Sequence, residues 1–186
     1  DGAPLGRYMS MVARFEERKG HRYAIKAFKK IIERDPSFNG LKLVLIGDGP
    51  LLEDMKSLAA SERLGNSVIF TGHRNDYAGY VASSVFLLNP STGYEDLPYV
   101  IIEAMSLGVP VIGTDIAGIP EEIEDGVTGI VIPPKEQASL ERAILKLLSD
   151  EEARTRMGKA ARERFRELFT MDKMVNSYLR LYGDAN

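Results

Sequence analysis

The chain has 186 residues, enough for one domain with its own core and too few for two of ordinary size. It contains no cysteine, which excludes disulfides, zinc–thiolate sites and a thiol nucleophile. Its two histidines, His21 and His73, are too far apart for a local metal motif, so we expect no metal or other cofactor. The net charge of −3 gives no electrostatic footprint for nucleic acid, so we expect no DNA or RNA partner.

The beginning of the sequence indicates a piece of a longer protein. No stretch reaches the ~18 apolar residues of a membrane span. Residues 1–6 have neither the basic nor the apolar region of a signal peptide, and their composition is typical of a linker. The chain does not begin with methionine. We therefore expect a linker over 1–6 and one cytoplasmic domain over 7–186.

Short apolar runs alternate with longer segments of helical periodicity. The runs rich in Val, Ile and Leu predict strands at Tyr8–Ala13, Leu41–Ile46, Val68–Thr71, Val85–Leu88, Val109–Gly113 and Gly129–Ile132. Apolar spacings of three and four predict helices at Lys19–Arg34, Leu51–Leu64, Asp76–Ala82, Tyr99–Leu107 and Ile119–Glu124. From Ala138 the pattern is helical to the end, with breaks near Asp150 and Thr170.

This alternation predicts an α/β domain with a doubly wound parallel sheet of about six strands and helices on both faces. Nearly continuous apolar strands are typical of sheets buried on both sides. Short strand-to-helix links imply right-handed crossovers between parallel strands. Ligands of such sheets bind outside the carboxyl ends of the strands, so the strand-to-helix loops are the segments where we look for a site.

Two of these loops have features of an anion site. The first carries Arg14 after its strand and Lys19 at the expected start of the helix, where free amides also favour an anion. A solvated charged loop explains the same residues equally well. The second loop, Gly47-Asp48-Gly49-Pro50, resembles a dinucleotide fingerprint but has Leu52 where that motif needs a third glycine. By itself it indicates only a tight turn and a close backbone approach.

Two further loops hold candidate residues. His73 alone is more often a surface or packing residue than a catalyst, and Arg74 could stack on a base or pair with phosphate. Gly118 would permit a close backbone approach before the helix that begins at Ile119-Pro120, although an ordinary strand-to-helix turn explains this loop at least as well.

A pair of glutamates gives the most informative signal. Glu95 precedes a predicted helix and Glu103 lies in its second turn, on an otherwise apolar segment where a carboxylate is costly without a partner. If the segment between them is helical, eight residues separate the carboxylates by about 12 Å, roughly the length of a nucleoside diphosphate. The helix amides between them would favour phosphate. Two chance acids on an amphipathic helix remain the alternative.

Taken together, these motifs resemble the C-terminal, nucleotide-sugar-binding domain of group-1 (family-4) retaining glycosyltransferases, which have the two-domain GT-B architecture. The resemblance runs from about Tyr8 to about Tyr182. It is carried, in order, by Arg14 with Lys19-Gly20, Gly47–Pro50, Glu95 with Glu103-Ala104-Met105, Leu107–Val111, Gly118–Glu121 and Asp125–Gly129. Each motif is weak alone, whereas six in order at compatible spacing are specific.

The resemblance implies a role for each candidate residue. Arg14 and Lys19 would neutralise the donor diphosphate, and Glu95 would hold hydroxyls of the donor sugar. Glu103 would accept from the ribose hydroxyls. The backbone after Glu95 would meet the phosphate or the sugar, and the loop with His73 and Arg74 would border the base. The substrate-binding residues expected on this basis are Glu103, Gly47, Gly49, His73, Arg74, Leu97, Pro98, Tyr99 and Val100, with Arg14, Lys19 and Glu95 as the catalytic set.

The resemblance also implies partners and limits. The donor would be a nucleoside-diphosphate sugar such as a UDP-sugar. The acceptor, and any membrane association, would belong to an N-terminal domain that this chain lacks, and the last helix would pack back toward it. The chain departs from the family pattern where Asp96-Leu97-Pro98 replaces the common Gly-Phe-Gly, and Pro98 has no N–H to offer a phosphate. A sugar-nucleotide epimerase of the same architecture and a non-catalytic α/β binding domain are the alternatives.

Overall fold

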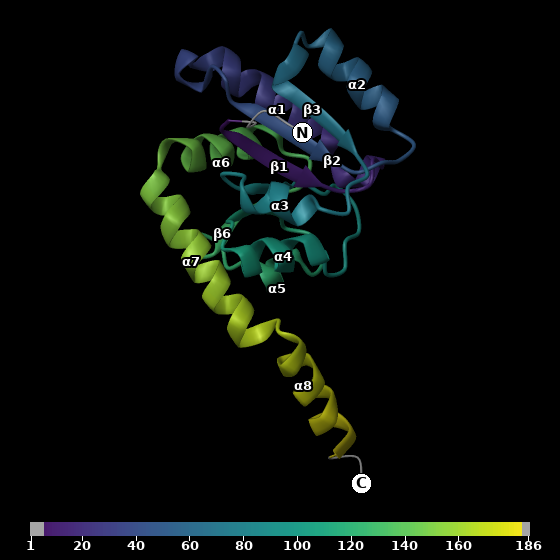
Figure 1. Cartoon of the computed structure of the whole chain (residues 1–186), viewed down its shortest axis with the longest axis vertical. Helices are drawn as coiled ribbons and strands as arrows, with labels where there is room; N and C mark the ends of the chain where they lie inside the picture. The colour runs from purple at the N-terminus through teal and green to yellow at the C-terminus, as the bar shows by residue number, and fades with distance from the viewer. Residues whose placement is uncertain (1–5, 184–186) are drawn as a thin grey trace.

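The computed structural model describes residues 6–183 and contains a parallel six-stranded sheet (Figure 1). Apart from Gly6, the linker expected at residues 1–6 lies outside the described residues. The strands are β1 (Tyr8–Val12), β2 (Lys42–Ile46), β3 (Val68–Gly72), β4 (Leu87–Asn89), β5 (Val111–Thr114) and β6 (Gly129–Ile132). They lie in the order β3-β2-β1-β4-β5-β6 and every neighbouring pair is parallel. The predicted doubly wound sheet of about six strands is confirmed.

Helices connect the strands and extend beyond the last one. They are α1 (His21–Arg34), α2 (Leu52–Ser61), α3 (Tyr77–Ala82), α4 (Tyr99–Leu107), α5 (Ile119–Glu122), α6 (Gln137–Ser149), α7 (Glu151–Leu168) and α8 (Met171–Gly183). The predicted breaks near Asp150 and Thr170 are confirmed. Asp150 caps α7 by accepting a hydrogen bond from the Ala153 amide at 2.8 Å.

The predicted start of the first helix was wrong. We expected a helix from Lys19, whereas Glu17–Lys19 forms a 3-10 turn and α1 begins at His21. Gly20 separates the two with a φ of 79°, and a Cβ at this position would overlap the carbonyl oxygen of Pro90. Only glycine adopts this conformation at little cost, so the chain turns here before the helix begins. Lys19 therefore lies on a turn and not on the helix.

Helices cover both faces of the sheet. One core joins the strands to α1, α2 and α6, and the other joins them to α3, α4, α5 and α7. Strand β2 shows why the apolar runs are continuous: Leu43 and Leu45 belong to the first core, while Val44 and Ile46 face the opposite side. A strand buried on both faces needs apolar residues at every position.

Helix α8 differs from the rest of the chain. It projects away from the sheet and its covering helices (Figure 1), and each of its residues is exposed. Its large apolar side chains are Met171, Met174, Val175, Tyr178, Leu179, Leu181 and Tyr182. Among residues 6–183, none of the helices combines the length and the apolar composition that a bilayer span requires.

The order of the strands places the loops that matter for function. From β1 the chain adds β2 and then β3 on one side of the sheet, and it adds β4, β5 and β6 on the other side of β1. The direction in which strands are added therefore reverses between β1 and β4. The loops that follow neighbouring parallel strands meet at one edge of the sheet. Crevices at such a switch point are the usual ligand sites of doubly wound sheets.

Candidate functional site

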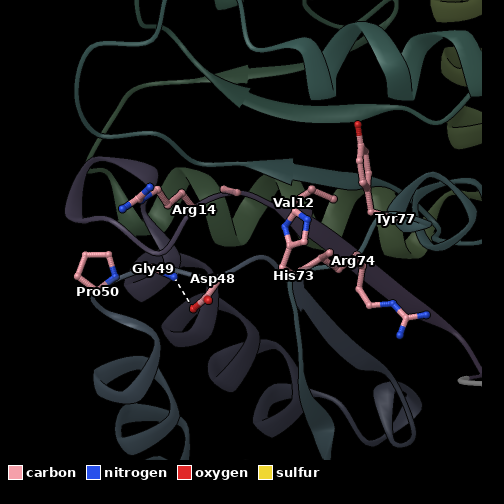
Figure 2. A pocket seen from close by; sticks show the side chains of 10 residues that line it. Val12, Arg14, Asp48, Gly49, Pro50, His73, Arg74 and Tyr77 are labelled. Atoms are coloured by element: carbon pink, nitrogen blue, oxygen red, sulfur yellow. Dashed lines mark hydrogen bonds between the residues drawn. The ribbon is translucent and has the colours of Figure 1, made fainter.

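One pocket of about 680 Å³ lies at the carboxyl ends of β1, β2 and β3 (Figure 2). Arg14 and Arg74 stand at its opposite ends with His73 between them. Its lining residues are Val12, Ala13, Arg14, Ile46, Asp48, Gly49, Pro50, His73, Arg74 and Tyr77. The structure thus brings together four of the predicted site residues, from three different loops.

The glycines after β2 hold the first two loops against each other. Gly49 has a φ of 154°, and a Cβ there would come within 2.7 Å of the backbone of Phe15. The Phe15 amide donates to the Asp48 carbonyl at 2.9 Å across the same contact. A Cβ at Gly47 would overlap the Ala13 carbonyl oxygen, and Gly47 does not line the pocket. The predicted close approach is therefore made to the neighbouring loop, which fixes the backbone next to Arg14.

A second pocket of about 670 Å³ lies between the loops that follow β1 and β4, at the switch point of the sheet. It contains the predicted residues Lys19 and Glu95 and the backbone that follows Glu95. Its lining residues are Arg18, Lys19, Tyr94, Glu95, Asp96, Leu97, Pro98, Tyr99 and Val100. Arg14 lines the first pocket and Lys19 the second, so the two predicted cations lie in different pockets.

The second pocket is built around the carboxylate of Glu95, whose side chain is only 7% exposed. The Lys19 Nζ donates to both oxygens of Glu95, at 2.5 and 2.7 Å. Arg18 Nη1 donates to Oε2 at 3.2 Å, and Ser91 Oγ lies at the same distance from Oε2. A carboxylate removed from water needs such partners. Sequence reasoning missed Arg18 and Ser91.

Glu16 links the two pockets through its own ion pairs. Its Oε1 lies 2.8 Å from Arg14 Nε, and its Oε2 lies 3.1 Å from Arg18 Nε. Together with Arg18–Glu95 and Lys19–Glu95, these contacts form a chain of alternating charge along the edge of the sheet. Three cations are thereby gathered within one short loop.

The predicted geometry of the two glutamates was only partly right. Helix α4 begins at Tyr99, so the segment from Glu95 to Pro98 is not helical and the estimate of about 12 Å does not apply. Glu103 does lie in the second turn of α4 and has the partner that its apolar surroundings require. The Tyr77 hydroxyl donates to Glu103 Oε1 at 2.6 Å. Glu103 lines neither pocket, whereas Tyr77 lines the first.

His73 and Arg74 lie on the exposed rim of the first pocket. His73 Nε2 is 3.1 Å from Asn75 Oδ1. Arg74 pairs with both carboxylate oxygens of Asp76, at 2.8 and 2.7 Å, and its guanidinium lies 5.5 Å from the ring centroid of Tyr80. Arg74 is therefore already engaged with protein groups on the side away from Arg14.

Two buried titratable groups lie close to these loops, and sequence reasoning missed both. His21 stacks on Phe15 with ring centroids 4.1 Å apart, and burial together with the charge of Lys19 lowers its pKa to about 4. Glu122, the last residue of α5, is 0% exposed, and neither carboxylate oxygen has a hydrogen-bond partner among the described residues. Burial raises the pKa of Glu122 to about 8, and the charges of Glu95 and Glu121 add to this effect.

Gly118 seats the start of α5 against the loop that carries Glu95. Its amide donates to the Glu95 carbonyl at 3.3 Å, and a Cβ on Gly118 would overlap the carbonyl oxygen of Asp96. The close backbone approach predicted at this glycine is confirmed.

Replacing Gly118 with alanine is expected to lower the free energy of unfolding by about 1–3 kcal/mol, because the loop around Asp96 must shift to admit the methyl group. Urea unfolding of G118A checks this. The control is G79A, since a Cβ at Gly79 in α3 meets open space and alanine favours the helix. Equal urea midpoints for G118A and the unsubstituted chain would show that the contact is not tight.

Comparison with known proteins identifies the family and agrees with the fold. The sequence model of the family described as "Glycosyl transferases group 1" matches residues 6–164. The chain belongs to this family.

Two curated relatives illustrate the family. The N-acetyl-alpha-D-glucosaminyl L-malate synthase of Bacillus anthracis is 34% identical over 174 residues, which are 94% of this chain and 44% of that protein. The alpha-D-kanosaminyltransferase of Streptomyces kanamyceticus is 33% identical over 162 residues, or 87% of this chain and 40% of that protein. The chain thus spans less than half the length of these relatives.

Solved structures show the same fold. Anabaena Alr3699/HepE in complex with UDP superposes with a TM-score of 0.87 at 22% identity, over 95% of this chain and 48% of that one. The C-terminal domain of a group 1 family glycosyl transferase (LpcC) from Francisella tularensis gives a TM-score of 0.80 at 20% identity, over 89% and 87% of the two chains. The chain therefore has the Rossmann-like fold of the C-terminal half of GT-B glycosyltransferases.

Proposed function

We propose that this chain is the donor-binding domain of a retaining glycosyltransferase, which transfers a sugar from a nucleoside-diphosphate sugar to an acceptor. The observation that carries the proposal is a pair of pockets at the carboxyl ends of the strands, with one loop presenting Arg14 to the first pocket and Arg18 and Lys19 to the second. Membership of the group 1 family supports it. UDP, which is bound in the similar Anabaena structure, is the first nucleotide to test.

The charge pattern suggests how the donor would bind. The nucleoside would enter the first pocket and the sugar the second, so that the diphosphate lies along the loop between Arg14 and Lys19. A diphosphate placed there would compete with Glu16 and Glu95 for the same cations. Glu95, once freed from Lys19, could accept from sugar hydroxyls, and Glu103 from those of the ribose.

The same groups would serve the chemical step. When the bond between sugar and diphosphate breaks, negative charge builds up on the departing diphosphate. Fixed cations and helix amides aimed at that charge stabilise the transition state. Pro98 precedes α4 and offers no amide, so the first amides of α4 that could serve are those of Tyr99 and Val100. We propose that these groups act without a metal ion.

We propose that the acceptor binds to another domain of the same protein and that this protein is cytoplasmic. The chain spans only 44% and 40% of its two relatives above, which leaves room for such a domain. The apolar side chains exposed on α8 would pack against it. The isolated chain is therefore expected to bind the donor without transferring sugar efficiently.

Calorimetric titration with UDP, GDP and ADP, in buffer containing a chelator, tests the proposal. Binding of at least one of them is expected, and R14A should weaken it about 10- to 100-fold because a charge-assisted contact to phosphate is lost. Arg14 is two-thirds exposed and pairs only with Glu16 in the described structure, so this change should leave folding intact. R156A, at an exposed position on α7, is the control. Unchanged affinity in R14A would refute the diphosphate assignment, and binding of none of the three nucleotides would refute the function.

A further inference from the structure

Tyr77 makes a contact that the proposed roles leave unused. Its hydroxyl donates to Glu103 Oε1 at 2.6 Å, which joins the first residue of α3 to the second turn of α4. This bond, with burial, raises the pKa of Tyr77 to about 12, so the hydroxyl keeps its proton and remains a donor at neutral pH. In Figure 2 the hydroxyl points away from His73 and the Arg74 guanidinium.

The surrounding structure holds Tyr77 in place. Its ring packs against the cores on this face of the sheet, and α3 is tied to β1 by the Tyr8 hydroxyl, which donates to the Tyr80 carbonyl at 2.7 Å. Arg74 and Asp76, just before the helix, are paired with each other. The hydroxyl therefore meets Glu103 from a fixed position and not from a mobile loop.

The contact leaves Glu103 with capacity to bind a ligand. A carboxylate has about four acceptor sites on its two oxygens, and Tyr77 occupies one of them. Among the described residues, no other side chain donates to the Glu103 carboxylate, and no cation lies within 4 Å of it. With Oε1 held, the carboxylate loses rotational freedom before any ligand arrives, and binding costs less when the acceptor is already ordered.

We propose that Tyr77 is a positioning residue that orients the Glu103 carboxylate toward the ribose hydroxyls of the bound nucleotide. Tyr77 lines the first pocket and its hydroxyl contacts Glu103, so the tyrosine links the nucleoside pocket to the proposed ribose acceptor. This inference rests on the proposed function, in which Glu103 accepts from the ribose.

The test compares ribonucleotides with their 2′,3′-dideoxy counterparts in Y77F. Calorimetry first measures UDP, GDP and ADP and the dideoxy form of whichever binds most tightly. Y77F is expected to weaken the ribonucleotide about tenfold, because a Glu103 carboxylate that is no longer oriented makes a poorer hydrogen bond to the ribose hydroxyls. It should leave the affinity for the dideoxy form unchanged, because that ligand has no hydroxyl for Glu103 to accept from.

The matched control is Y80F, which removes a hydroxyl from the same helix but not from Glu103. Phenylalanine at position 77 keeps the ring contacts, and thermal unfolding verifies that both variants are folded. Equal losses for the two ligands in Y77F, or no loss for either, would overturn the inference while leaving the function intact. Failure of the unsubstituted chain to bind any of the ribonucleotides would instead overturn the proposed function, and this inference with it.

Discussion

Replacing Lys19 with methionine is expected to lower the free energy of unfolding by about 2–4 kcal/mol. The side chain of Lys19 is 15% exposed and that of Glu95 is 7% exposed, so the substitution leaves a buried carboxylate without its closest cation. Arg18 and Ser91 stay within 3.2 Å of Glu95 and moderate the loss. Urea unfolding at neutral pH measures it.

A second substitution distinguishes this electrostatic cost from lost packing. K19M combined with E95Q should recover most of the stability, because no charge is then left unpaired. The control is K29M, since Lys29 pairs with the exposed Glu33 at 2.7 Å on α1 and such surface pairs contribute less than about 1 kcal/mol. If K19M costs no more than K29M, or if E95Q fails to restore stability, Glu95 does not depend on Lys19. The diphosphate could then recruit this lysine at little cost.

Replacing Glu122 with glutamine is expected to change how stability depends on pH. The pKa of Glu122 is raised to about 8 in the folded chain, so between about pH 4.5 and pH 8 the unfolded chain ionises this carboxyl while the folded chain keeps it protonated. The folded state binds the extra proton, and stability falls as the pH rises through this window. At about 1.4 kcal/mol per pKa unit, the loss over the complete titration is on the order of 5 kcal/mol.

The measurement is the difference in unfolding free energy between E122Q and the unsubstituted chain at several pH values. Between pH 4.5 and pH 8, E122Q should gain about 4 kcal/mol of unfolding free energy relative to the unsubstituted chain. His21, whose pKa is lowered to about 4, contributes with the opposite sign below pH 6.5, but this contribution is common to both proteins and cancels. E163Q, at an exposed position on α7 away from Glu122, should give a flat difference. A flat difference for E122Q as well would show that Glu122 is ionised in the folded chain.

These two predictions concern one region of the molecule. Gly118 joins the start of α5 to the Glu95 carbonyl, and the charge of Glu95 adds to the pKa shift of Glu122 at the other end of that short helix. If Glu122 is neutral, Glu95 is the only one of these two glutamates that carries a negative charge. Lys19 and Arg18, which contact Glu95, balance that charge. The loss of stability expected when Glu122 ionises therefore depends in part on the charge of Glu95 in the proposed sugar pocket.

Much of the fold could be predicted from local patterns. Strands with Val, Ile and Leu at nearly every position are typically buried on both faces. This pattern predicts a parallel sheet that is covered by helices on both sides. The breaks at Asp150 and Thr170 follow from local signals for the start and end of a helix, and both predictions are correct. The start of α1 was missed because the conformation of Gly20 depends on Pro90, which lies 70 residues further along the chain.

The candidate site was predicted unevenly for the same reason. Topology brings every strand-to-helix loop to one edge, so these loops could be expected near a ligand. The structure places Arg14 and Gly49 in one pocket at this edge, and Lys19 and Glu95 in another. Their side-chain partners could not be predicted. Tyr77 lies 26 residues from Glu103, and Arg18 lies 77 residues from Glu95.

The sequence by itself determined the class of fold, the edge of the sheet that holds the site and the family to which the chain belongs. These depend on periodicity and on the order of motifs, which are properties of the chain read along its length. Only the tertiary structure decided that Lys19 is paired with Glu95, that Tyr77 holds Glu103 and that Glu122 is buried without a partner. The interactions of charged and hydrogen-bonding groups depend on distances of a few ångströms between segments far apart in sequence, and local sequence patterns do not specify those distances.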